Sequence, residues 1–157
     1  METKFDWKTS LFSNKFEIFR NGMPAGELSK GNWKRKVTGE LNSRKIQFNT
    51  KGFFSHETLI IDLRDDSIIG TIVFSNWKSK ASINYQNRDF NWQFDNLLRT
   101  KWSMGNENGV IVKYLSEILK GTINSYTGDE ILILSGFFIR NFFRQRSAGI
   151  ASAYVSS

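Results

Sequence analysis

Apolar and polar residues alternate with a period of two along much of the first 125 residues, which predicts short β-strands. The odd positions from Trp33 to Leu41 and from Trp77 to Tyr85 are mainly apolar, and the even positions are mainly polar. A short polar break and a second alternating run follow each of them, as in a β-hairpin. The side chains that this pattern places in the core include Trp33, Phe48, Trp77 and Trp92.

Two segments, at about 16–50 and 60–94, repeat each other at a spacing of 44 residues. Between residues 20–50 and 64–94 the alignment contains seven identities in 31 positions, where average composition predicts about two. It superposes Arg20 on Arg64, and the block Gly-x5-Asn-Trp-Lys-x-Lys begins at Gly26 and again at Gly70. Each copy predicts about four strands.

A third, degenerate set of strands is predicted between Leu97 and Asn124, and one more strand in the first dozen residues. The total is eleven or twelve short antiparallel strands. Such strands protect their edges by closing into a barrel or by stacking as a sandwich.

The alternation of apolar and polar residues ends near residue 127. Thr127 and Glu130 have the spacing of a capping box, which predicts a helix at about 128–148. Its first half is apolar on nearly every side, so we expect the other elements to enclose it, with Leu134, Phe138 and Phe142 in the core. The apolar run from Ile131 to Phe143 is interrupted by polar residues and is shorter than the roughly 18 residues of a membrane-spanning helix.

Repeated strands built on Gly-x5-Asn-Trp-Lys-x-Lys, followed by one very apolar C-terminal helix, resemble the tubby C-terminal-like superfamily. The similarity is greatest to its LURP-one-related and phospholipid-scramblase branches and runs from about Phe16 onward. It implies a mainly β fold, a closed antiparallel barrel of about 12 strands with the helix through its centre. Residues 1–157 are then one domain. The resemblance also implies a non-enzymatic protein whose outward basic pairs bind phosphoinositide head groups.

Composition narrows the chemistry. With 157 residues, 39% of them hydrophobic and 15% aromatic, the chain fits one folded domain. It contains no cysteine and one histidine, His56, which excludes a disulfide scaffold and a thiolate metal site. His56 with Glu57, and the acidic cluster at 62–66, lack a partnered nucleophile, and the sequence contains no phosphate-binding loop. We expect no enzymatic activity, no metal and no cofactor.

The net charge of +7 is concentrated in residues 30–51, which hold seven Lys or Arg and one Glu. The candidate phosphate ligands are outward lysines in the two copies of the repeat, namely Lys34, Lys36, Lys45, Lys78 and Lys80. Outward lysines also serve simply to keep strands soluble and to prevent edge pairing.

The charged opening residues are unlike a signal peptide, so we expect a cytoplasmic protein, peripheral to a membrane. The function that the sequence favours is a binding module for anionic phospholipid head groups. Two alternatives stay open, a protein-interaction scaffold and RNA or single-stranded DNA binding through the basic region 30–51. Nucleic acid is less favoured, because the tryptophans fall at the alternating positions that face the core, whereas base stacking needs exposed rings.

Overall fold

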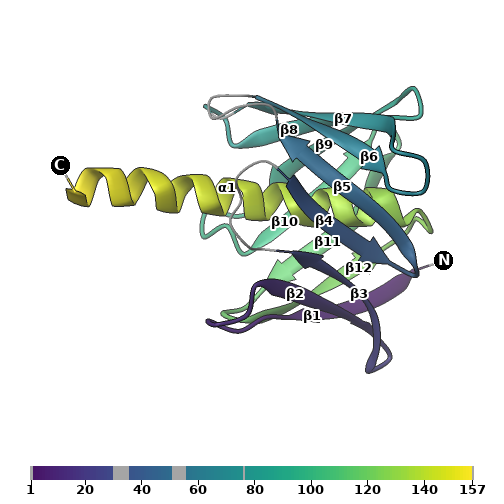
Figure 1. The fold of residues 1–157 in the computed structure, drawn as a ribbon, viewed down its shortest axis with the longest axis horizontal. Coiled ribbons are helices and arrows are strands. Elements are labelled where there is room, and N and C mark those ends of the chain that lie inside the picture. The colour runs from purple at the N-terminus through teal and green to yellow at the C-terminus, as the bar shows by residue number, and fades with distance from the viewer. Residues whose placement is uncertain (1, 30–35, 51–55, 76, 157) are drawn as a thin grey trace.

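The computed structural model describes residues 2–29, 36–50, 56–75 and 77–156, with the backbone alone for 147–156. The twelve strands and one helix in this part of the chain are shown in Figure 1. The strands are β1 (Thr3–Lys8), β2 (Lys15–Arg20), β3 (Met23–Ser29), β4 (Lys36–Leu41), β5 (Arg44–Thr50), β6 (Glu57–Asp62), β7 (Ser67–Ser75), β8 (Lys80–Tyr85), β9 (Arg88–Phe94), β10 (Lys101–Asn106), β11 (Gly109–Ser116) and β12 (Lys120–Ser125), and the helix is α1 (Glu130–Ser156).

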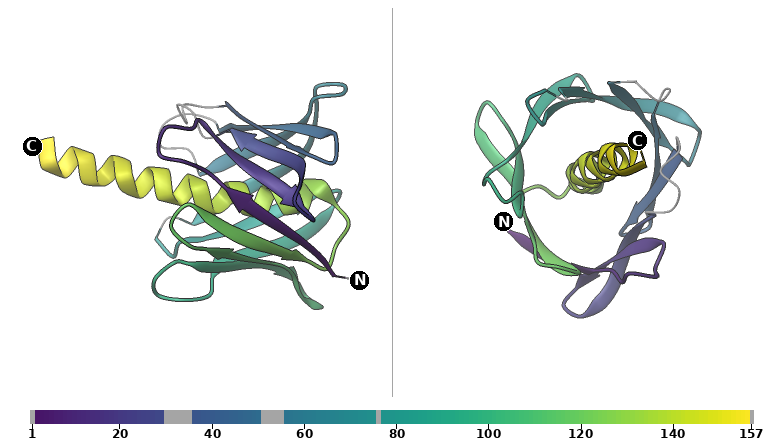
Figure 2. Two further views of the ribbon diagram at one scale, coloured as in Figure 1. Left: turned by 90° about the horizontal axis from the view of Figure 1, so that it is seen from below. Right: turned by 90° about the vertical axis from the view of Figure 1, so that its left-hand side faces the viewer.

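The strands form one closed antiparallel barrel in which each strand pairs with its neighbours in the chain and β12 pairs with β1. Helix α1 passes through the middle of this barrel and projects from one end of it (Figures 1 and 2). We call the end where α1 begins the N-cap end and the end where it leaves the exit end. The predicted fold, a closed barrel of 12 strands with a C-terminal helix, is confirmed.

The alternation of apolar residues explains why the barrel closes around the helix. Side chains in β4, β5, β8 and β9 are buried and exposed in turn. All residues from Ile131 to Arg140 are buried, so α1 is enclosed on every side within the barrel. Among the predicted core side chains, Phe48, Trp92, Leu134 and Phe138 are buried and Phe142 is partly buried, whereas Trp33 lies outside the described residues.

Trp77 is the exception, because it is 95% exposed and the prediction that it belongs to the core is wrong. It lies in the turn that precedes β8, and Ser79 in this turn has a φ of 50°. An alternating pattern places side chains on two faces only where the backbone is extended. The predicted start of the third set of strands, at Leu97, is also wrong. Leu97 lies in a turn, where the backbone is not extended, and β10 begins at Lys101.

The two copies of the sequence repeat share the same pairing register, between β3 and β4 in the first and between β7 and β8 in the second. Gly26 in β3 faces Leu41 and Gly70 in β7 faces Tyr85, each one residue beyond an irregularity in its own hairpin. A Cβ atom at either glycine would overlap the backbone of the next strand, at the carbonyl oxygen of Glu40 or of Asn84. This close approach explains why both copies have glycine there.

The superposition of Arg20 on Arg64 is wrong, because Arg20 ends β2 while Arg64 lies in the β6–β7 turn. That turn spans residues 63–66, whereas the β2–β3 turn spans only 21–22. Strands β10, β11 and β12 form a third unit, and β1 takes the place of its fourth strand. Its first hairpin has the same kind of register shift, between Met104 and Gly105. The barrel therefore consists of three four-strand units, and the third combines β1, the first strand, with β10, β11 and β12, the last three.

Helix α1 starts at Glu130, where the Asp129 carboxylate accepts a hydrogen bond from the backbone N–H of Ile131 at 3.0 Å. The N-cap is Asp129, and the hydroxyl of Thr127 instead accepts from the Asp129 N–H. The helix is longer than the predicted range of 128–148. Within the described residues, no helix has both the length and the apolar character that crossing a bilayer requires.

Candidate functional site

The exit end carries large apolar side chains that are in contact with solvent instead of the core. They lie on all four loops that the structure describes at this end, at 9–14, 77–79, 95–100 and 117–119. Their exposure runs from 79% to complete, and we call them the apolar rim: Leu11, Phe12, Trp77, Leu97, Leu98 and Ile118. Elsewhere in the described residues the most exposed large apolar side chain is Met23, at 70%.

The four loops are neighbours around the barrel and are bonded to one another. Thr9 N–H donates to the carbonyl of Leu119 at 2.8 Å, which joins the first loop to the fourth. Ser116, the last residue of β11 before the fourth loop, donates its N–H to the carbonyl of Thr100 in the third loop at 2.8 Å. The Arg99 guanidinium donates to the Ser79 hydroxyl at 3.0 Å, which joins the third to the second. The four loops that carry the apolar rim are thus linked to one another at the exit end.

Local geometry explains why the leucines face outward. The side-chain oxygen of Asn96 accepts hydrogen bonds from the backbone N–H groups of Thr100 and Lys101, at 3.0 and 3.1 Å. Its amide group donates to the Thr100 hydroxyl at 2.7 Å. Asn96 thereby closes the loop on itself, and Leu97 and Leu98 are left at its tip.

Basic residues surround the apolar rim. Lys78 lies in the same turn as Trp77, and the strands that adjoin these loops begin or end in exposed lysines, namely Lys8, Lys80, Lys101 and Lys120. Lys120 pairs with Glu117 at 3.6 Å. An apolar surface bordered by cations is suited to a surface that combines hydrocarbon with negative charge.

The predicted phosphate ligands do not lie together. Lys36, Lys78 and Lys80 are at the exit end, but Lys45 is near the N-cap end, opposite Glu40 on β4. Lys36 and Lys80 begin strands that are four positions apart, which is about 19 Å along the sheet at 4.8 Å per strand. These two lysines therefore lie on different sides of the exit end and would not hold the same phosphate group. Lys34 lies outside the described residues.

One arginine of the helix lies at the mouth of the barrel. Arg140 is 9% exposed, and its guanidinium donates to the Ser116 hydroxyl at 2.9 Å and to the Asn141 side-chain oxygen at 3.3 Å. The guanidinium carbon is 5.1 Å from the centre of the Trp102 ring. Burial and the charge of Arg144 lower the pKa of Arg140 to about 10, so it remains charged at neutral pH. The sequence pattern does not single out Arg140, because in the sequence this residue is only an interruption of an apolar run.

The acidic cluster at the N-cap end has a structural role. Asp62 is buried, and its carboxylate accepts hydrogen bonds from Arg44 at 3.0 Å and from Arg64 at 2.9 Å. These hydrogen bonds, chiefly that from the Arg64 side chain, lower the pKa of Asp62. Asp65 accepts from the N–H and hydroxyl of Ser67 and so shapes the β6–β7 turn. The described residues include no group of acidic or histidine side chains suited to a metal ion.

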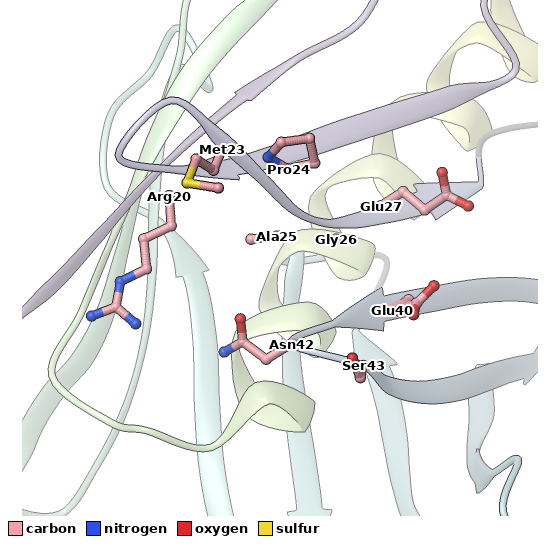
Figure 3. Close-up of a pocket in the computed structure, with 9 residues that line it drawn as sticks. All are labelled: Arg20, Met23, Pro24, Ala25, Gly26, Glu27, Glu40, Asn42 and Ser43. Carbon is pink, nitrogen blue, oxygen red and sulfur yellow. The ribbon is translucent and has the colours of Figure 1, made fainter.

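An open groove of about 580 Å³ lies at the N-cap end, where β3 and β4 diverge (Figure 3). It is lined by residues of both charges, including Arg20, Glu27 and Glu40. In Figure 3 Arg20 and Glu27 lie at opposite ends of the groove and point away from each other. Its charged groups do not converge on one ligand.

No family model, no curated protein and no solved structure matches this chain. Kinship with the tubby-like superfamily therefore stays a prediction that rests on the repeat and on the order of the elements.

Proposed function

We propose that this protein is a non-enzymatic module that binds an anionic membrane surface with its exit end. The observation that carries this proposal is the apolar rim, with a large and nearly fully exposed apolar side chain on each described loop at that end. Soluble proteins rarely gather such side chains on one surface unless it contacts a partner or a membrane. The proposed ligand is still anionic phospholipid, as the sequence favours, but the proposed contact is made by the rim loops and not by paired lysines.

Insertion of the rim into lipid is favourable in free energy. Transfer of apolar surface from water contributes roughly 25 cal/mol per Å², or about 1.5–3 kcal/mol for a large side chain that becomes fully buried. Trp77 is further suited to an interface, because its indole ring combines an apolar body with one polar N–H group. The six side chains are carried by short loops and need not unfold anything in order to reach the lipid.

The surrounding cations add a preference for negatively charged lipid. Each Lys or Arg held near an anionic bilayer contributes about 1 kcal/mol, which declines within a Debye length of roughly 8–10 Å. Lys78 and Lys80 lie at the exit end, where they would reach head groups beside the inserted loops. Binding should therefore weaken as salt rises.

Helix α1 is compatible with this orientation. It projects past the barrel at the exit end, on the same side as the rim (Figure 1). Residues 147–157 contain no charged side chain. Ten helical residues rise about 15 Å, which is half the roughly 30 Å of hydrocarbon in a bilayer. The side chains of the projecting segment would thus add no charge to the leaflet that the segment enters.

Single-stranded nucleic acid is the closest competitor, because Trp77 and Phe12 are exposed rings near lysines. Binding of that kind depends on aromatic rings that stack on successive bases. The other four members of the rim are Leu11, Leu97, Leu98 and Ile118, which are aliphatic and have no ring to stack. The composition of the rim therefore favours hydrocarbon over bases.

The test is co-sedimentation with vesicles of phosphatidylcholine alone and of phosphatidylcholine mixed with phosphatidylserine. We expect the wild type to bind the mixed vesicles, and the double variant Leu97→Ser/Leu98→Ser to bind them about tenfold or more weakly, because two inserted side chains are lost. The matched control is Met23→Ser/Ile68→Ser, which removes two exposed apolar side chains at the N-cap end. That control should bind like the wild type.

Equal binding by the two double variants would contradict the proposal. So would a wild type that binds single-stranded RNA, measured by fluorescence anisotropy, while it ignores the vesicles.

A further inference from the structure

Arg140 carries a positive charge that nothing in the described chain neutralises. No carboxylate of the described residues forms an ion pair with it, although 91% of the residue is removed from solvent. The nearest acidic residue along β11 and its loop, Glu117, pairs instead with Lys120. A buried charge without a counter-ion is costly, and the cost falls when an anion is bound beside it.

The groups that contact Arg140 are neutral. Ser116 accepts one hydrogen bond from the guanidinium, and its own hydroxyl donates to the carbonyl of Glu117 at 2.8 Å. Asn141 accepts the other bond, and its amide group donates to the carbonyl of Phe137 at 2.8 Å. These partners orient the guanidinium without cancelling its charge. Within the described chain they use two of its five N–H donors, so others remain for a ligand.

The position of Arg140 matches that of a lipid head group. Ser116 is the last residue of β11, next to the loop of Ile118, and it is bonded to Thr100 at the base of the loop of Leu97. Arg140 therefore lies at the foot of two rim loops. Arg144 is exposed and follows one helical turn later, on the same face of α1 and toward the exit end.

We propose that Arg140 and Arg144 bind the phosphate group of an anionic phospholipid at the barrel mouth, while the adjacent rim loops contact its acyl chains. A guanidinium fork matches the oxygens of a phosphate and forms charge-assisted hydrogen bonds to it. This inference rests on the proposed function, since it names the head-group site of the same surface. It differs from a general attraction to cations because it assigns the phosphate to two named arginines, of which Arg140 is buried.

The first arm of the test uses a soluble phosphate and no membrane. Glycerol 3-phosphate is titrated against the wild type, Arg140→Gln, Arg144→Gln and Lys101→Gln at constant ionic strength, and Tm is measured. A ligand that binds only the folded state raises Tm. We expect a rise for the wild type and Lys101→Gln, a smaller rise for Arg144→Gln and none for Arg140→Gln. Lys101 is the matched control, because it is an exposed cation at the same end.

The second arm measures binding of the same proteins to phosphatidylcholine vesicles with and without phosphatidic acid. Loss of an exposed cation that does not contact the phosphate, as in Lys101→Gln, should weaken binding by at most about fivefold, the effect of one charge near an anionic surface. Arg140→Gln should weaken binding to the phosphatidic acid vesicles by about tenfold or more, as expected for lost charge-assisted hydrogen bonds. Arg144→Gln, an exposed position, gives the same readout if Arg140→Gln does not fold.

The outcomes separate the two proposals. A vesicle effect specific to Arg140 and Arg144 supports the lipid phosphate, with or without a Tm shift from the soluble compound. If Arg140→Gln and Arg144→Gln behave like Lys101→Gln in both arms, the phosphate site is refuted, while vesicle binding by the rim still stands. A Tm shift without vesicle binding by the wild type refutes the lipid source and the proposed function together.

Discussion

The indole N–H of Trp92 and that of Trp102 both donate to the carbonyl oxygen of Gly136, at 2.9 and 3.1 Å. Two adjacent strands, β9 and β10, thus hold one point of the helix backbone. The Tyr114 hydroxyl of β11 donates to the carbonyl of Ile133 at 2.7 Å, one turn earlier. Apolar contact has no preferred direction, whereas these hydrogen bonds do. They set the depth and rotation of α1 in the barrel, and with them the place of Arg140 at its mouth.

Gly136→Ala should destabilise the protein although alanine favours helices. A Cβ atom at Gly136 would overlap the Tyr114 hydroxyl and lie 2.8 Å from its ring carbon Cζ. Overpacking of this kind costs about 1–3 kcal/mol. Replacing a helical glycine by alanine gains about 1 kcal/mol, so overpacking alone gives a net loss only if its cost is toward the upper end of that range. The displaced hydroxyl adds a lost buried hydrogen bond, about 1–3 kcal/mol. Urea unfolding should show a lower midpoint. Gly128→Ala, where a Cβ meets nothing within 4 Å, should leave the midpoint nearly unchanged.

Phe138→Asp should unfold the whole barrel. The Phe138 ring is fully buried and stacks on that of Phe48, with 4.2 Å between centroids and 6° between planes. An unpaired carboxylate there costs several kcal/mol, against a total stability of about 5–15 kcal/mol. Circular dichroism should show loss of the β-sheet signal. A folded, soluble Phe138→Asp protein would be incompatible with a helix enclosed by strands.

Asp62→Asn should lower Tm at neutral pH and remove part of the acid sensitivity. Hydrogen bonds from Arg64 hold the pKa of Asp62 below its ordinary value of 3.8. A carboxyl with a lowered folded pKa contributes stability above 3.8, and this contribution is lost as pH falls through the folded value. The Tm difference between wild type and variant should therefore be constant above about pH 5 and shrink below pH 4. The same change at exposed Asp66, in the adjacent turn, should lower Tm much less at neutral pH.

Trp77→Ser should leave stability within about 0.5 kcal/mol of the wild type, because an exposed loop side chain contributes little to folding. Trp92→Ser, which removes a fully buried ring, should instead cost at least about 3–5 kcal/mol. Chemical denaturation followed by circular dichroism compares the two. A large loss of stability in Trp77→Ser would mean that this ring packs against the barrel.

Charge reversal at the two ends should have opposite outcomes on vesicles that contain phosphatidylserine. Lys78→Glu/Lys80→Glu changes the exit end by four charge units and should weaken binding by more than tenfold at low salt. Lys45→Glu/Arg88→Glu makes the same change near the N-cap end. It should have little effect, because that end faces away from the membrane in the proposed orientation. The difference should diminish as salt is added. Similar losses in both double variants would indicate attraction to net charge alone.

Several features of the fold follow from local pattern. Alternating residues predicted the strands and most inward side chains, such as Phe48 and Trp92, because extended backbone places successive side chains on opposite faces. The apolar circumference of residues 131–139 predicted an enclosed helix, since no other environment buries all its sides. The glycines at 26 and 70 marked equivalent positions in the two copies of the repeat.

The sequence by itself thus determined a barrel-forming set of strands and a helix to fill them. Tertiary structure alone decided that Trp77 is exposed, because a turn at Ser79 ends the alternation. It also decided that β1 completes the third unit and that four loops, far apart in sequence, share one rim beside Arg140. Such neighbours are set by closure of the barrel through contacts between distant residues, and local periodicity carries no information about which loops meet.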